Sequence, residues 1–460
     1  MREMSSRTRE LLFLIPAALV GLLGAASVAS ARTDELQAGP VAIAGIVAAL
    51  FVVMHIALRM RCPQADPYTL PLVGMLAAIG LVTLYRINPD LARDQVLWLG
   101  VGTLVFVALL VLLPDHGMLE QYRYLIGLAA VGLLLVTMIF GTEIYGARLW
   151  ITLPGGQTVQ PGELVKVLLV IFLAGYMHDK RELLAIPTNT IRGIPVPPLA
   201  VLAPMLLLVG AALGLVVVLN DFGTALLFFG VFLAMLFVAT GRAPYAVVGF
   251  AMFVVGSLAV WAATPRIQDR VDTWLHPFDD PQGRGYQLVQ SLYALADGGV
   301  LGPGWGGGFL VTENGQTIVP VLETDFIFTA VGAELGLVGA LAVLAVFVLL
   351  IARGFTIAAQ AQNGFSKLLA VGLTATLGLQ ALLIIGGVVR LVPLTGVTLP
   401  FMSYGGSSVI TNFGVIALLL IISHRSRRPY RPRVSRGGQA WRSSVPVDSG
   451  GRDDDAEVIA

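Results

Sequence analysis

The sequence predicts an all-α, polytopic integral membrane protein with about twelve transmembrane helices. Apolar residues make up 56% of its 460 positions and charged residues only 12%, a composition typical of chains that cross a bilayer many times. Uncharged stretches near the length that a helix needs to span the hydrocarbon core recur along most of the chain. These runs lack the alternation of a membrane β-barrel, so helices are the expected spanning form.

Each span is placed on one of these runs, in order along the chain. Two N-terminal spans are predicted at 11–30 and 40–58. The other ten are predicted at 70–85, 96–114, 124–141, 163–178, 198–218, 222–241, 245–263, 326–352, 367–389 and 404–423. The chain therefore divides into a short tail (1–10), two additional helices (11–69), a membrane domain (70–423) that contains a large loop (264–325), and a polar tail (424–460).

The distribution of Lys and Arg predicts the orientation in the membrane. With a cytoplasmic N-terminus, the inner side collects most of the basic residues, including Arg7, Arg59, Arg61 and the run that starts at Arg425. The positive-inside rule therefore places both termini in the cytoplasm and the loop 264–325 outside.

Global features exclude several other classes. The basic start and Ala29-Ser30-Ala31 resemble a signal peptide, but the apolar run is too long for a typical signal core, so we expect no cleavage. The single cysteine, Cys62, excludes disulfides and thiolate metal sites. The formal net charge is only +1, and the basic segment 425–436 suits anionic lipid better than nucleic acid. Residues 437–460 have a disorder-like composition.

The outer loop contains one short predicted helix, from Tyr286 to Leu295, between segments broken by proline and glycine. Gln287, Gln290 and Ser291 recur on one face of that helix at spacings of three and four. A solvated polar face is the simplest interpretation. A long loop whose apolar content is too high for disorder is usually functional, however, which favours a binding role.

Polar residues at the edges of spans are further candidates, because a charge in hydrocarbon is costly unless it is paired or lines a cavity. GARLWI (146–151) and QPGELVK (160–166) bring several such residues to one helix entrance: Arg148, Trp150, Gln160, Glu163 and Lys166. Glu163 and Lys166 can neutralise one another. A structural ion pair beside an interfacial tryptophan is therefore the competing interpretation.

Two breaks in the apolar pattern carry more candidates. NDFGTA (220–225) interrupts a long apolar run, and Asp221 is predicted to cap the helix that follows, as a simple turn would also require. LTGVTLPFMSYGGSS (394–408) displays Ser403 and Ser407 on irregular backbone. Such backbone is tolerated at membrane depth mainly where protein or a watery cavity covers it.

The segment VPVLETDFIF (319–328) sets Asp325 where a polar loop becomes a long apolar helix. A carboxylate there can meet both water-soluble sugars and a lipid tail. Asp325 is therefore either a reacting group or the cap of that helix.

In this order, the motifs resemble the SEDS family, the shape, elongation, division and sporulation proteins that include RodA and FtsW. The matching strings are GARLWI, QPGELVK, DFGTA, DDPQGRGYQLVQS, ETDFIF followed by AELG, and PLTGVTLPFMSYGGSS. The resemblance covers the ten spans from residue 70, so the first two spans look like an addition to a ten-helix core. The stretch VVRLVPLTGVTLPF favours a RodA-like member, while elongation and division both stay open as roles.

The resemblance implies a peptidoglycan glycosyltransferase of the bacterial cytoplasmic membrane. Such an enzyme polymerises lipid II into glycan strands on the outer surface by inverting transfer, with a class B penicillin-binding protein, a transpeptidase, as partner. Asp325 matches the family's catalytic aspartate and would act as general base for the acceptor sugar hydroxyl. A free aspartate, with a pKa of about 3.9, is a weak base, so burial would help by raising its pKa.

The substrate-binding residues expected from the residue patterns and the resemblance are Arg148, Trp150, Gln160, Glu163, Lys166, Asp221, Thr224, Gln287, Gln290, Ser291, Thr324, Arg390, Ser403 and Ser407. The leaving pyrophosphate needs positive charge, which Arg148, Lys166, Arg390 or a divalent cation such as magnesium or manganese could supply. No metal ligands and no other cofactor are assigned.

Some positions depart from the family pattern. Val321 stands where many members have a glutamate, and Glu323 stands at a place that is often histidine, so Glu323 is the candidate for any second carboxylate role. Asn220, Gly162 and Ile384 replace the usual proline, serine and asparagine. Two further hypotheses stay open: a flippase or transporter of lipid-linked precursors, suggested by Glu163 and Lys166, and a non-catalytic scaffold.

Overall fold

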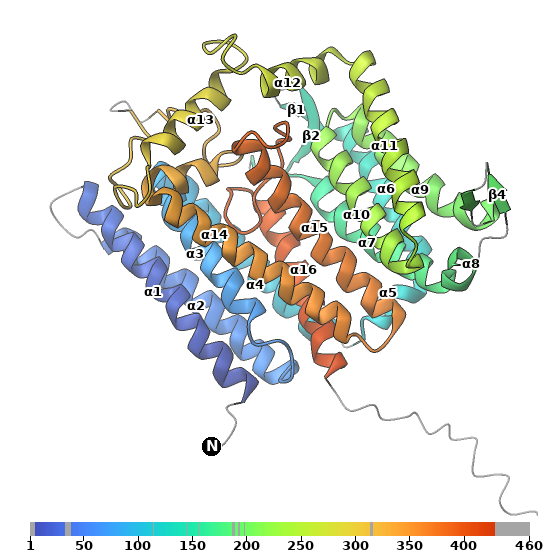
Figure 1. The fold of residues 1–460 in the computed structure, drawn as a ribbon. Coiled ribbons are helices and arrows are strands. Elements are labelled where there is room, and N and C mark those ends of the chain that lie inside the picture. Colours follow the sequence, from blue (N-terminus) through green and yellow to red (C-terminus); the bar gives the residue numbers. More distant parts are fainter. Residues whose placement is uncertain are drawn as a thin grey trace, which may run out of the picture. The chain divides into compact units, whose positions relative to one another are not determined.

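The computed structural model describes residues 5–32, 38–113, 115–144, 146–154, 156–185, 189–191, 194–196, 198–312 and 316–427. Twelve helices within these residues are long and apolar enough to cross a membrane, which confirms the predicted fold class (Figure 1). They are α1 (Ser6–Arg32), α2 (Ala38–Arg61), α3 (Thr69–Ile87), α4 (Pro89–Leu112), α6 (Arg123–Phe140), α7 (Pro161–Asp179), α9 (Leu199–Val218), α10 (Phe222–Thr240), α11 (Ala243–Ala263), α14 (Ile327–Gln360), α15 (Gly364–Val388) and α16 (Gly406–Ser426). The interpretations of the tail beyond Arg427 lie outside the described residues.

Shorter elements lie between the spans. The helices are α5 (Gly117–Gln121), α8 (Arg181–Ala185), α12 (Pro265–Leu275) and α13 (Tyr286–Asp297). The strands β1 (Thr142–Ile144), β2 (Ala147–Thr152) and β3 (Thr158–Val159) form an antiparallel sheet in that order, and β4 (Asn189–Ile191) pairs with β5 (Ile194–Val196). The predicted outer-loop helix is confirmed as α13, whereas α12 and the small sheets were not predicted, because short elements give weak periodic signals.

Two span boundaries differ from the prediction for local reasons. α4 begins at Pro89 rather than near residue 96, because the Asn88 side chain accepts hydrogen bonds from the Asp90 and Leu91 amides and starts the helix in a polar segment. α14 runs to Gln360 but is broken at Gly336, whose φ is 64°. The part before the break, 327–335, is a short helix of its own, called here the Asp325 stub because it follows Asp325.

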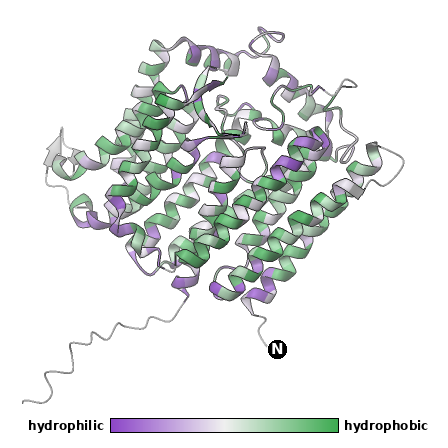
Figure 2. Ribbon diagram, turned by 180° about the vertical axis from the view of Figure 1, so that it is seen from behind, coloured by the Kyte–Doolittle hydropathy of each residue, from purple (hydrophilic) through white to green (hydrophobic). Residues whose placement is uncertain are grey.

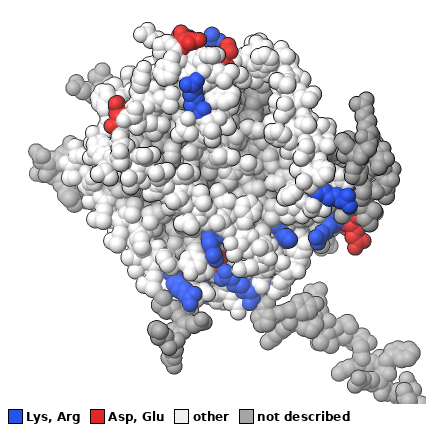
Figure 3. Space-filling model, in the orientation of Figure 1, with Lys and Arg blue, Asp and Glu red and all other residues white. Residues whose placement is uncertain are grey.

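The helices sort into an interior and an outer layer. In α3, α7, α15 and α16 at least 78% of the most apolar stretch is buried, whereas this share is at most 33% in α1, α2, α4, α6, α9, α11 and α14 and is 50% in α10. Figure 2 shows apolar residues along the middle of the helices and polar ones near their ends. On the face seen in Figure 3, Lys and Arg gather near the lower edge, below a broad band with few charges. A membrane would occupy that band.

A buried polar network fastens the N-terminal end of α1 to the rest of the domain. The Arg7 guanidinium donates to Glu10 and to the Ala65 carbonyl, and Glu10 Oε1 lies 2.6 Å from His55 Nδ1 on α2. Asp66, in the loop after α2, accepts from Arg353 on α14. The two additional helices are therefore tied to the ten-helix core by charge as well as by packing against α3 and α4.

Candidate active site

Asp325 lies in the wall of a polar cavity of about 330 Å³. The cavity is built from the β1–β2–β3 sheet, the turn between α9 and α10, helix α12, and the irregular segments before α14 and α16. Its polar lining includes Trp150, Gln157, Thr158, Gln160, Asn220, Asp221, Arg266, Arg270, Thr324, Thr395, Thr398, Tyr404, Ser407 and Ser408. We call this the inner cavity.

A second polar cavity of about 320 Å³ also has Asp325 in its lining. It is lined by α12, α13, the end of the segment before α14 and the segment between α15 and α16, and it shares Asp325, Arg266, Arg270 and Gly396 with the inner cavity. We call it the outer cavity. Asp325 and the two arginines therefore line both cavities.

A third cavity of about 510 Å³ is almost wholly apolar. It lies between α9, α10, α11 and α12, and Arg270 is the one charged residue in its described lining. Since Arg270 also lines both polar cavities, a lipid tail in the apolar cavity would bring its polar end to that guanidinium.

The Asp325 carboxyl titrates far from its usual range. Burial raises its pKa to about 6, against the opposing effects of the Thr324 hydrogen bond and the Arg270 charge. This confirms the expectation that burial raises the pKa of Asp325, whereas its role as a base stays a prediction. The alternative role as a helix cap is wrong, because α14 follows Phe326 and no side chain caps it.

Arg266 and Arg270 are four residues apart on α12 and therefore point to the same side. Arg266 Nη1 donates to the Gly146 carbonyl at 2.8 Å, and Arg270 Nη1 approaches the Leu394 carbonyl at 3.4 Å. Burial lowers the pKa of Arg270. The sequence analysis placed both arginines in the outer loop and gave them no role in the site. The amphipathic pattern PRIQDRVDTWL is the signal that could have identified this helix and its polar face.

The loop that carries Asp325 is bonded to the loop before α16. Ser403 Oγ donates to the Thr324 carbonyl at 2.5 Å, and the Tyr404 amide donates to the Glu323 carbonyl at 2.9 Å. Both loops contain a non-glycine residue in the left-handed region, Val321 (φ 56°) and Phe401 (φ 65°). Such backbone persists only where its surroundings hold it, and strain of this kind is common at active sites.

Gln95 of α4 is hydrogen-bonded to the loop before α16. Its side chain donates to the Ser403 carbonyl at 3.1 Å and accepts from the Gly405 amide at 3.3 Å. Gln95 was missed by the sequence analysis, although a glutamine at the edge of an apolar span is the kind of signal used elsewhere in the chain. Ser403 is buried outside the cavity lining and contacts the Asp325 loop instead.

The predicted ion pair between Glu163 and Lys166 is confirmed, with Nζ and Oε2 2.7 Å apart. Both residues are buried in α7, behind the inner cavity rather than in its lining. Lys166 Nζ also donates to Gln380 Oε1 at 2.9 Å, and Gln380 Nε2 donates to the carbonyl of Thr398, a cavity residue, at 2.8 Å. The pair therefore supports the cavity wall through Gln380, which the sequence analysis missed.

Asp221 caps α10 as predicted, accepting from the Thr224 amide at 3.0 Å. Its carboxylate also lines the inner cavity, and burial raises its pKa. Thr224 is buried behind it.

The structure brings together only part of the predicted binding set. Trp150, Gln160, Asp221, Thr324 and Ser407 line the inner cavity, and Gln287 lines the outer one. Others are engaged elsewhere: Arg148 is 59% exposed and pairs with Glu143, Arg390 donates to the Trp274 and Leu275 carbonyls, and Ser291 bonds Thr329. Gln290 lies outside both described linings. Substrate contacts of all these residues stay predictions.

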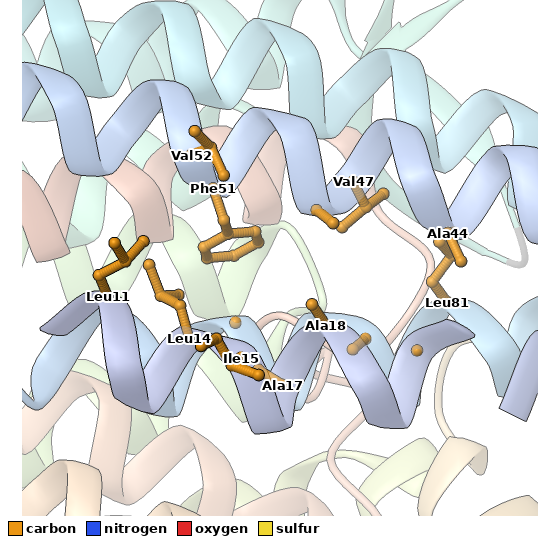
Figure 4. Close-up of a pocket in the computed structure, with 14 residues that line it drawn as sticks. Leu11, Leu14, Ile15, Ala17, Ala18, Ala44, Val47, Phe51, Val52 and Leu81 are labelled. Atoms are coloured by element: carbon orange, nitrogen blue, oxygen red, sulfur yellow. The ribbon is translucent and has the colours of Figure 1, made fainter. Parts of the chain in front are cut away.

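A fourth cavity, of about 120 Å³, lies between α1, α2 and α3 (Figure 4). Its described lining is wholly apolar and includes Leu14, Phe51 and Leu81. It offers no group for acid–base chemistry or for polar contacts.

Comparisons with known proteins agree with this geometry. The model of the cell cycle protein family of FtsW, RodA and SpoVE matches residues 65–428, which begin after α2. A peptidoglycan glycosyltransferase RodA of Mycobacterium tuberculosis is 39% identical over 443 residues, covering 93% of this chain and 92% of that relative. Stage V sporulation protein E of Bacillus subtilis is 30% identical over 366 residues, covering 77% and 95%.

Solved structures give the same result. A chain from a peptidoglycan synthase complex, described as coordinating polymerization and crosslinking, matches with a TM-score of 0.64 and 29% identity, covering 79% of this chain and 99% of that one. The crystal structure of Thermus thermophilus rod shape determining protein RodA matches with a TM-score of 0.56 and 26% identity, covering 80% and 98%.

Proposed function

Since the chain belongs to the cell cycle protein family of FtsW, RodA and SpoVE and is a multi-pass membrane peptidoglycan glycosyltransferase, we propose that it polymerises lipid II around Asp325. The observation that carries the proposal is the place of that carboxylate. It has a pKa raised to about 6 and stands between two polar cavities that share two arginines. A base near neutrality between two substrates is what the reaction needs.

In the proposed step, the Asp325 carboxylate takes the proton of the acceptor sugar 4-hydroxyl as its oxygen attacks the donor's anomeric carbon. The bond from that carbon to the pyrophosphate oxygen breaks, and its electron pair leaves with the lipid pyrophosphate. One base without a nucleophilic carboxylate gives inversion.

The leaving group is best served by Arg270, with Arg266 beside it. A polyprenyl chain in the apolar cavity would end at Arg270, so its pyrophosphate would meet a guanidinium in a half-buried setting, where the attraction between opposite charges is stronger than in bulk water. This revises the expectation from sequence, because Arg148, Lys166 and Arg390 are held by other partners.

A divalent cation fits this site only if the substrate supplies some of its ligands. The described residues contain no group of three or more His, Cys, Asp or Glu side chains that could hold a metal. Asp221 and Asp325 both line the inner cavity, and magnesium commonly uses one or two carboxylates together with substrate phosphates. When bound there, the cation would neutralise pyrophosphate charge.

The proposal includes an orientation and a partner. Lys and Arg cluster near the edge where the chain begins, whereas α12 and the sheet at the cavities lie at the opposite edge (Figures 1 and 3). We place that first edge in the cytoplasm and the cavities outside. A class B penicillin-binding protein is the proposed partner, supported by the match to a synthase complex that couples polymerization to crosslinking.

Purified protein with labelled lipid II, alone and with the transpeptidase, tests the function. Glycan chains are the expected product. Translocation of lipid II across vesicles without chains would replace the proposal by the transporter hypothesis, and neither activity would favour the scaffold.

A further inference from the structure

The outer end of α1 contacts the segment 303–308 of the outer loop, although α1 lies outside the residues that match the family. Ser27 Oγ donates to the Trp305 carbonyl at 3.1 Å. A Cβ atom at Gly24 would lie 2.8 Å from the Trp305 ring, and one at Gly306 would lie 2.4 Å from Ala31 Cβ. Gly24, Ser27 and Ala31 follow the three-and-four spacing of one helix face, so α1 presents a continuous contact surface to this segment.

The same segment is hydrogen-bonded to the far end of the Asp325 stub. The Gly304 amide donates to the Glu334 carbonyl at 2.8 Å, and the Gly306 amide donates to Glu334 Oε1 at 3.2 Å. Arg86 of α3 completes the joint, donating to Glu334 Oε1 at 2.9 Å and to the Gly308 carbonyl at 3.0 Å. Glu334 is fully buried, so this joint has little freedom to move.

The stub connects Glu334 to the loop that carries the Asp325 carboxylate. It runs as one helix from Ile327 to the break at Gly336, and Asp325 precedes it by two residues. Its length is about 13 Å at the rise of an α-helix. A small tilt at the Glu334 end therefore displaces the Asp325 end by a comparable amount.

We propose that α1 is part of the support of the active site, and that Trp305 is a positioning residue through which α1 sets the placement of Asp325. The network of Arg7 and Glu10 fixes the other end of α1, so the helix is anchored on both sides of the membrane domain. The additional N-terminal helices thereby have a role in the reaction. This inference rests on the proposed function of Asp325.

The test uses two matched glycine substitutions in the full-length protein. Gly24→Ala places a methyl group against the Trp305 ring, whereas Gly45→Ala on α2 places one where no atom lies within 4 Å. We expect Gly24→Ala to lower kcat by about tenfold or more at nearly unchanged KM for lipid II, since displacements of about 1 Å can cost that much. It should also shift the midpoint of the pH–rate profile, while Gly45→Ala matches the wild type.

Trp305→Ala serves as the second variant, because it removes the ring without any collision and should give the same loss of kcat. If Gly24→Ala does not fold, the kcat and the pH midpoint of Trp305→Ala test the inference instead. Wild-type kcat and pH midpoint in the folded variants, or a change in KM alone, would overturn the inference. An inactive wild-type protein would instead refute the proposed function, so the two failures are distinguishable.

Discussion

Asp325→Asn separates the chemical role of this residue from any structural one. The amide keeps the shape of the side chain but does not accept a proton at working pH, so a general base is lost while packing against the two cavities is kept. Removal of such a group typically costs about a hundredfold or more in rate. We therefore expect the variant to be folded, membrane-inserted and unable to form glycan chains.

The same substitution should make the protein more stable. With a pKa raised from 3.8 to about 6, the ionised carboxylate is disfavoured in the folded state by up to about 3 kcal/mol at neutral pH. The sign follows from linkage: a carboxyl whose folded pKa is raised favours folding below its unfolded pKa, and that contribution disappears as pH rises towards 6. A neutral asparagine avoids this cost, so Tm in detergent at pH 7.5 should rise.

The assays are chain formation from labelled lipid II, Tm, and the pH dependence of kcat/KM. Wild-type kcat/KM should be flat above the Asp325 pKa of about 6 and fall roughly tenfold per pH unit below it, because only the ionised carboxylate accepts a proton. Near-normal chain formation by Asp325→Asn would refute the base assignment. A Tm below that of the wild type would contradict the buried-charge argument.

Three further outcomes follow from the cavity geometry. Arg270→Gln should lower kcat by about a hundredfold, whereas Arg93→Gln, whose side chain is 66% exposed, should not; equal rates for both would remove Arg270 from the pyrophosphate site. For Glu163 and Lys166, each single change to alanine should lower Tm or activity more than the double change, because a single change leaves a buried charge without its partner; additive losses would mean that the two do not interact. Gln287→Ala should raise KM for lipid II, while Gln290→Ala, outside both cavity linings, should change it less; the reverse order would place the substrate elsewhere.

Long apolar runs made the spans predictable, and local pairs made part of the site predictable. The Glu163–Lys166 pair and the Asp221 cap depend on residues three apart, so the sequence contains all the partners. The break in α14 was missed because Gly336 is surrounded by good helix formers. Glycine is needed there for two reasons: its φ is positive, and a Cβ at Gly336 would lie only 2.4 Å from the Gly302 amide nitrogen.

The arginines near the site show why its remaining residues could not be predicted from the sequence. Arg148 and Arg270 are both arginines near the outer ends of spans, and only tertiary contacts distinguish them. One pairs with Glu143 across two strands, and the other faces three cavities from an amphipathic helix. Motif order could single out Asp325 as the candidate base, because Asp325 is fixed to the start of a spanning helix. The position of Arg270, the cation proposed for the leaving group, depends on where α12 lies over the membrane domain, and no local pattern encodes that position.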